Sequence, residues 1–155
     1  MKTMIPSVRL SLLACGLGLA VATLGHAADE TYEVKSKTAK VVVGGKASAS
    51  VTITTKKGWH LNAEAPLTLR LTPGPGVTVD KTRLTRADLA ASSDTSARFD
   101  VALGATHPGT SEVVGEAGFV LCQDTECRPI REKLIIGVDA IPAKTEPGTP
   151  GKAKK

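Results

Sequence analysis

Aromatic side chains are scarce in this 155-residue chain, which holds one Trp, one Tyr and two Phe. A hydrophobic core must therefore be built from Val, Leu, Ile and Ala. The sequence also lacks the motifs Gly-x-Ser-x-Gly and His-Glu-x-x-His, and no pair of carboxylates can be placed in a cleft. These absences argue against the common hydrolase mechanisms.

Residues 1–27 have the pattern of a signal peptide. Lys2 and Arg9 supply a basic start, residues 10–24 form an apolar stretch, and small residues precede Ala27. We expect cleavage after Ala27 and a periplasmic or secreted protein. No later stretch approaches the roughly 20 apolar residues that span a bilayer.

A lipoprotein is the alternative, because Leu12-Leu-Ala-Cys15 resembles a lipobox. That interpretation leaves only a few apolar residues between Arg9 and Cys15, whereas a signal peptide usually has about 7–15. Cleavage after Ala27 is therefore preferred, and it removes Cys15 with the leader.

The formal charge of +5 is concentrated at the two ends of the chain. Two cations lie in the leader, and the Pro-, Gly- and Lys-rich tail of residues 141–155 is also positive. Residues 28–140 are therefore near neutral, without the basic field that nucleic-acid binding needs. We expect them to form one domain, followed by a disordered tail.

The segment from Thr31 to Ala140 has β-strand patterns throughout. Alternating or β-branched residues predict strands at residues 51–55, 67–71, 77–79, 98–103 and 133–138. Turn signals occur at Gly44-Gly45, Lys57-Gly58, Pro73 to Gly76, Gly104 and Pro108-Gly109. This spacing is typical of an all-β sandwich. Only residues 84–91 could hold a short helix, and we treat them as a connection.

Cys122 and Cys127 are the only cysteines beyond the leader, and they flank the polar loop Gln123-Asp-Thr-Glu126. Asp124 and Thr125 favour a turn, so the flanking segments should form a hairpin with the cysteines opposed at its mouth. Opposed residues have Cα atoms about 4.5–5.5 Å apart, which suits a disulfide.

Two roles are open for this pair. A bridge that closes so short a loop adds only about 2 kcal/mol in the chain-entropy model, which favours a redox-active dithiol. Small exported domains also carry inert hairpin disulfides. The alternative is therefore a non-enzymatic binding module in which the bond is structural.

Neighbouring charges should act on the thiols in both directions. Asp124, Glu126 and Glu116 would raise the thiol pKa values, while Arg128 and Arg131 would lower them. The pair is not a Cys-x-x-Cys at a helix N-terminus, so exchange with a thioredoxin-like partner is favoured over unaided attack on substrates.

A metal site would need His60 or His107 beside the two thiols, and no second ligand pair has suitable spacing. Copper handling would favour Met and His, yet both Met residues lie in the leader. We therefore expect neither a metal nor a cofactor.

Two blocks of residues resemble a known family. Gly58-Trp-His-Leu-Asn62 followed by Ala65-Pro-Leu67 is similar to a signature of the N-terminal periplasmic domain of the thiol:disulfide interchange protein DsbD. Phe119-x-x-Cys122 and Cys127-Arg-Pro129 resemble the strand–Cys–loop–Cys–x–Pro element of that domain. The resemblance covers roughly residues 51–138.

The resemblance implies an immunoglobulin-like β-sandwich with the cysteine pair at one end. It also implies that Cys122 and Cys127 exchange electrons with a thioredoxin-like protein, one forming the mixed disulfide and the other resolving it. Pro129 would shape the strand after the second cysteine. For Trp59 and His60 the resemblance implies a position rather than catalysis. A Trp in a sandwich strand usually packs in the core, and a histidine such as His60 is more often structural than a proton donor.

The chain also departs from the family pattern. It lacks the membrane-spanning electron carrier and the thioredoxin domain of full-length DsbD, so we expect any electron donor to be a separate protein. The family covers its cysteines with a cap loop that bears an aromatic residue. The corresponding residues 87–97 have none, and Leu89 is their only bulky side chain. Loss of the redox role is therefore an open alternative.

Overall fold

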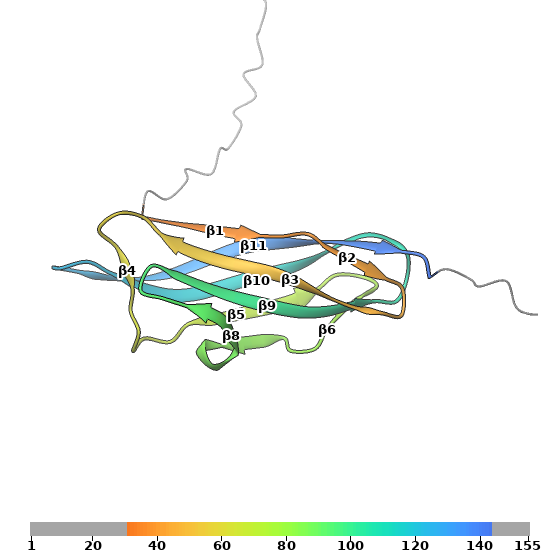
Figure 1. Ribbon diagram of the computed structural model, residues 1–155, viewed down its shortest axis with the longest axis horizontal. Helices are drawn as coiled ribbons and strands as arrows, with labels where there is room; N and C mark the ends of the chain where they lie inside the picture. Colours follow the sequence, from red (N-terminus) through yellow and green to blue (C-terminus); the bar gives the residue numbers. More distant parts are fainter. Residues whose placement is uncertain (1–30, 144–155) are drawn as a thin grey trace, which may run out of the picture.

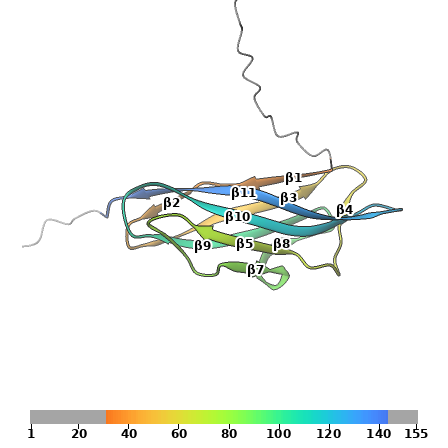
Figure 2. The same cartoon turned by 180° about the vertical axis from the view of Figure 1, so that it is seen from behind.

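The computed structural model describes residues 31–143. The predicted signal peptide and residues 144–155 of the predicted tail lie outside this range. The described residues fold into two β-sheets that pack face to face (Figures 1 and 2). The only helix among them is a three-residue 3-10 turn, and none is long and apolar enough to cross a membrane.

The first sheet has the strand order β1-β3-β9-β6, and β8 also pairs with β9. Its strands are β1 (Tyr32–Ser36), β3 (Lys46–Thr55), β6 (Val77–Val79), β8 (Leu89–Ser92) and β9 (Ser96–Ala105). The second sheet has the order β2-β11-β10-β5-β7, and β4 also pairs with β10. Its strands are β2 (Ala39–Val42), β4 (His60–Leu61), β5 (Thr68–Pro73), β7 (Arg83–Thr85), β10 (Gly109–Cys122) and β11 (Cys127–Ile141).

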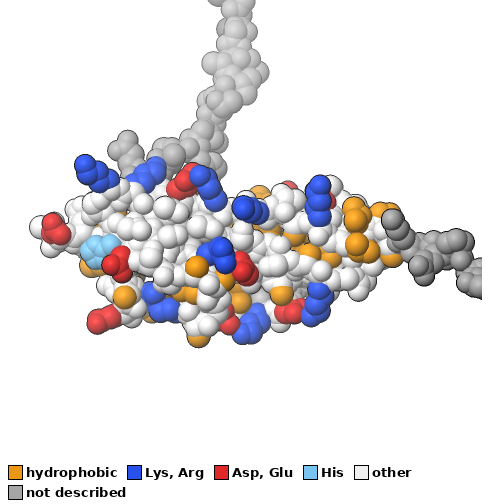
Figure 3. Space-filling model, viewed as in Figure 1, with side chains coloured by type: hydrophobic (Ala, Val, Ile, Leu, Met, Phe, Trp, Pro, Cys, Tyr) orange, Lys and Arg blue, Asp and Glu red, His pale blue; other side chains and the backbone are white. Residues whose placement is uncertain are grey.

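The predicted fold class is confirmed: the domain is an all-β, immunoglobulin-like sandwich. All strand pairs are antiparallel except β2 with β11. The core between the sheets is mainly aliphatic, as the shortage of aromatic residues requires, with Phe99 and Phe119 as its buried rings. On the face drawn in Figure 3, basic and acidic side chains are interspersed, in keeping with a near-neutral domain.

All five predicted strand segments lie in or overlap observed strands. One predicted turn is wrong, because Gly104 lies inside β9. A Cβ atom at Gly104 would lie 3.0 Å from Thr78 Oγ1 and 3.1 Å from the carbonyl oxygen of Gly45. The glycine therefore allows close packing of neighbouring chain segments rather than a turn.

Residues 84–91, which we expect to be a connection able to hold a short helix, contain one helical turn, η1 (Arg86–Asp88), between β7 and β8. The Asp88 carboxylate accepts hydrogen bonds from the Thr85 backbone N–H at 2.9 Å and the Thr85 hydroxyl at 3.1 Å. It also forms an ion pair with Lys81. The hydrogen bonds from Lys81 and from the Thr85 N–H lower the pKa of Asp88 below its usual value.

We predict that Asp88→Asn lowers the melting temperature at pH 7 and that this difference shrinks in acid. A carboxylate with a lowered folded-state pKa stabilises the fold above its unfolded-state pKa of about 4. That stabilisation is lost as the pH falls through the lower folded-state value. Thermal unfolding followed by circular dichroism between pH 7 and pH 2 measures the difference.

Asp124→Asn is the control, because this exposed carboxylate at the hairpin tip forms no ion pair with another described residue. A destabilisation by Asp88→Asn that is equal at all pH values would show that the carboxylate charge plays no part.

Candidate functional site

The candidate site lies where β10 ends and β11 begins. All 14 residues of β10 pair with β11, and the last pair is Cys122 with Cys127. The two residues form a disulfide with Cα atoms 4.0 Å apart. The Gln123 N–H donates to the Glu126 carbonyl at 2.9 Å across the loop. The predicted hairpin is confirmed, although the cysteines lie closer together than expected.

The two cysteines differ in exposure. Cys122 is 4% exposed, whereas Cys127 is an exposed residue. The Asn62 side-chain Nδ2 donates to Cys122 Sγ at 3.5 Å. A group that approaches the disulfide from solvent therefore meets Cys127 first, and Cys122 lies behind it beside an amide donor.

Strand β4 brings the first sequence block against the cysteine block. His60 pairs with Cys122, and Leu61 pairs with Leu121. The Asn62 N–H continues this pairing by donating to the Val120 carbonyl at 3.0 Å. The two blocks that carry the family resemblance are far apart in the sequence and adjacent in the fold.

Asn62 is held in place by its own turn. Its Oδ1 accepts hydrogen bonds from the backbone N–H groups of Glu64 at 2.9 Å and Ala65 at 3.0 Å. The guanidinium of Arg86 donates to the Asn62 carbonyl at 2.7 Å and to the Ala65 carbonyl at 2.9 Å. These contacts leave Nδ2 directed toward Cys122.

Sequence reasoning missed the roles of both Asn62 and Arg86. An Asx-type turn is recognisable locally, because Asn side chains often accept bonds from backbone N–H groups two residues on. Arg86 offers no local signal, since its partners come from a segment more than 20 residues away.

Trp59 does not lie inside the closed core, where we expect it. It is a partly buried residue just before β4 that packs against the core. The guanidinium of Arg128 lies 4.9 Å from the centroid of the Trp59 ring. Arg128 also donates to the Glu126 carboxylate at 2.7 Å. This cation–π contact fastens the start of β4 to the hairpin.

The predicted charge effects on the thiols need correction. Arg128 pairs with buried Leu121 rather than with a cysteine, so its side chain leaves the sheet on the face opposite the disulfide. Glu116 lies six residues before Cys122 on β10, which places it about 20 Å away. Neither residue is placed to act directly on the sulfur atoms.

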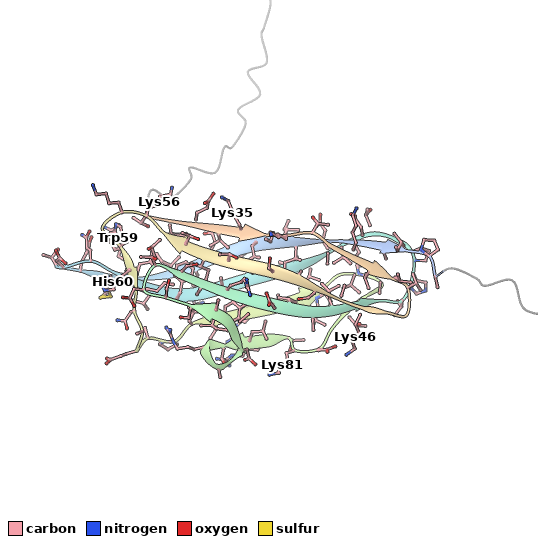
Figure 4. All side chains as sticks on the ribbon, in the orientation of Figure 1. Lys35, Lys46, Lys56, Trp59, His60 and Lys81 are labelled. Atoms are coloured by element: carbon pink, nitrogen blue, oxygen red, sulfur yellow. A yellow bond between two sulfur atoms is a disulfide. The ribbon has the colours of Figure 1, made fainter. Side chains whose placement is uncertain are left out.

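His60 is exposed, which contradicts the expectation of a satisfied structural histidine. As the cross-strand partner of Cys122, it projects from the same face of the sheet as the disulfide. Figure 4 shows Trp59 and His60 at the hairpin end of the molecule. His107 lies just before β10, about 45 Å from the cysteines along that strand. The two histidines therefore cannot share one metal site, and residues 31–143 contain no cluster of potential ligands.

Residues 87–97 do not place Leu89 over the disulfide. Leu89 packs against the core and pairs with Phe99 in the first sheet. The turn after β8 does reach β4, because the Asp94 carbonyl accepts a hydrogen bond from the Leu61 N–H at 2.6 Å. The side chain that contacts Cys122 Sγ is that of Asn62, which belongs to a different segment from the cap expected for the family.

We predict that Cys127 alkylates faster than Cys122 in the reduced protein, on the order of tenfold, because thiol reactivity follows access. The measurement is limited alkylation with iodoacetamide, followed by peptide mass spectrometry. The fully unfolded protein supplies the reference, since burial then protects neither thiol. Equal labelling of both cysteines in the folded protein would contradict the predicted asymmetry.

No protein-family model matches the chain, and no curated protein matches its sequence significantly. Solved structures show a likeness in fold at low identity. Domains 4 and 5 of the S-layer protein SbsC align at 15% identity and a TM-score of 0.39, covering 72% of this chain and 51% of theirs. AggA, the major subunit of aggregative adherence fimbriae type I from Escherichia coli, aligns at 11% identity and a TM-score of 0.36, covering 75% and 99%.

The PapD-like domain 7 of human CEP192 aligns at 10% identity and a TM-score of 0.35, covering 90% of this chain and 100% of that one. The chain spans about half the length of the SbsC fragment. Such distant likenesses give no information about function.

Proposed function

We propose that this chain is an exported domain that exchanges disulfides with a thioredoxin-like protein through Cys122 and Cys127. The observation that supports this most directly is the unequal environment of the two sulfur atoms. One is exposed for attack, and the other is buried beside an amide that can stabilise a thiolate. The resemblance of both sequence blocks to the N-terminal domain of DsbD points to the same chemistry.

The first step is attack by a thiolate of the partner on Cys127 Sγ. A new sulfur–sulfur bond joins the two proteins, and the Cys122–Cys127 bond breaks. Cys122 leaves as a thiolate with the bonding electron pair. The Asn62 amide, 3.5 Å from this sulfur in the disulfide form, then donates to an anion, and such charge-assisted hydrogen bonds are the stronger kind.

The second step returns Cys127 to the thiolate form. The second thiolate of the partner attacks the partner's own sulfur in the mixed disulfide, and Cys127 is released with the electron pair. Two electrons have then passed from the partner's dithiol to this domain, which is reduced. In the reverse direction, the Cys127 thiolate attacks an oxidised partner and Cys122 resolves the mixed disulfide.

As a purely structural bond, the disulfide would add little to the stability of the fold. The bridge closes a loop with a sequence separation of 5, worth about 2 kcal/mol in the chain-entropy model. The hairpin is already aligned by the full length of β10. A stabilising bridge would add more by joining the two sheets, where it would close a longer loop.

We predict that Cys122→Ala forms a covalent complex with a thioredoxin probe much faster than Cys127→Ala does. The probe is thioredoxin with its second active-site cysteine changed to serine and its first carried as a mixed disulfide with thionitrobenzoate. Attack releases the coloured thiol. Because Cys122→Ala retains the exposed thiol, its rate should be higher, on the order of tenfold or more.

The two variants are matched controls, since both lose the disulfide and its roughly 2 kcal/mol. Reaction of each variant with free Ellman's reagent corrects for access by small molecules. If both thiols react with the small reagent and neither reacts with the probe, the disulfide is structural and the domain is a binding module.

A further inference from the structure

The disulfide is one end of a continuous surface on the outer face of the second sheet, which is turned toward the viewer in Figure 2. Alternate residues of β10 share that face with their partners on β11. The successive pairs, moving away from the hairpin tip, are Cys122 with Cys127, Val120 with Pro129, Gly118 with Arg131, and Glu116 with Lys133.

A groove of about 530 Å³ begins next to the disulfide on this face. Pro66, Val120 and Pro129 line the part nearest the cysteines. Gly118 lies at the floor of the groove. A Cβ atom at this position would lie 3.1 Å from Thr68 Oγ1. The absent side chain at this position contributes to the hollow. The volume lies within the range of about 300–1,000 Å³ that is common for binding sites.

The far part of the groove is positively charged. Arg131 and Arg70 line it from β11 and β5, and both side chains are exposed. Among the described residues, no hydrogen bond or ion pair is found for either guanidinium. Lys133 follows Arg131 on the same face, and Glu116 is the one acid that lines the groove. A ligand with carboxylates would complement these charges.

We propose that this groove binds an extended, acidic segment of the partner protein, next to the partner's reactive cysteine. This inference rests on the proposed exchange function and names the feature by which the partner is recognised. Apolar or small side chains of the segment would contact Val120 and Pro129. Arg131 lies four residues from Cys127 on β11, about 13 Å away. An extended segment would therefore bring a carboxylate to Arg131 about four residues from its cysteine.

The groove lies on the face of a central strand pair, because β10 is hydrogen-bonded to β11 on one side and to β5 on the other. A partner strand therefore cannot extend the sheet at this place. Side chains rather than backbone groups must make the contacts, so recognition depends on the charge and size of the partner's side chains.

The test uses two synthetic peptides of equal length with one central cysteine. One carries Glu and Asp about four residues from the cysteine, and the other carries Lys at the same positions. Versions with serine in place of cysteine measure docking alone, by fluorescence anisotropy on the oxidised protein. The variants are Arg70→Glu with Arg131→Glu, and, as a control with an equal charge change elsewhere, Lys37→Glu with Arg98→Glu.

We expect the wild type to bind the acidic serine peptide at least several-fold more tightly than the basic one. Reversing Arg70 and Arg131 should invert this preference, and reversing Lys37 and Arg98 should preserve it. With the cysteine peptides, the exchange rates should follow the same order. Reduction by dithiothreitol, which has no carboxylate for Arg70 and Arg131 to bind, should be the same for all variants.

Equal binding of the two serine peptides, or a preference that survives reversal of Arg70 and Arg131, would overturn the inference. Failure of the proposed function would look different. In that case neither the cysteine peptides nor the thioredoxin probe would open the disulfide, while the serine peptides would still report whether the groove selects acidic segments.

Discussion

The pairing of β10 with β11 is the constraint on which the site depends. It runs without interruption from Gly109 with Ala140 to Cys122 with Cys127. A slip of one residue would move every side chain of a strand to the opposite face of the sheet. The buried side chains of β10 resist such a slip, because they would be exchanged for exposed ones. The core of the sandwich therefore sets the position of the disulfide at the hairpin mouth.

A second pairing makes the two sulfur atoms different. Strand β4 joins only one edge of the hairpin, next to Cys122, and leaves Cys127 uncovered. The Asn62 turn, fastened by Arg86, supplies the one hydrogen bond to sulfur found among the described residues. Trp59 fixes the same segment to the hairpin through Arg128. The unequal burial of the two cysteines thus follows from the pairing of β4 with β10 alone on this side of the hairpin.

Much of the fold was accessible from the sequence, because its signals are local. Alternation of polar and apolar residues located strands, and the Asp-Thr loop located the hairpin. The wrong predictions concern residues whose neighbours in the fold are distant in the sequence. Gly104 has the appearance of a turn residue, but its neighbours Thr78 and Gly45 come from distant segments. The positions of Trp59 and Leu89 depend likewise on which strands become neighbours, and no short pattern specifies that.

The chemical details of the site were predictable only in part. The cysteines could be identified by elimination, and their opposition followed from the length of the loop. Which sulfur is exposed depends on the β4–β10 pairing, across a separation of 60 residues between Asn62 and Cys122. The expected effect of Glu116 on the thiol pKa values is wrong because the hairpin is fully extended. Six residues along the strand then correspond to about 20 Å.

The proposed exchange requires that partner proteins can reduce the Cys122–Cys127 bond. Its most direct test is the reduction potential of the bond in glutathione redox buffers, measured on protein without residues 1–27. We expect a midpoint between about −120 and −270 mV, the range of proteins that exchange disulfides. A bond that remains oxidised below about −300 mV would be structural, and the domain would not exchange disulfides.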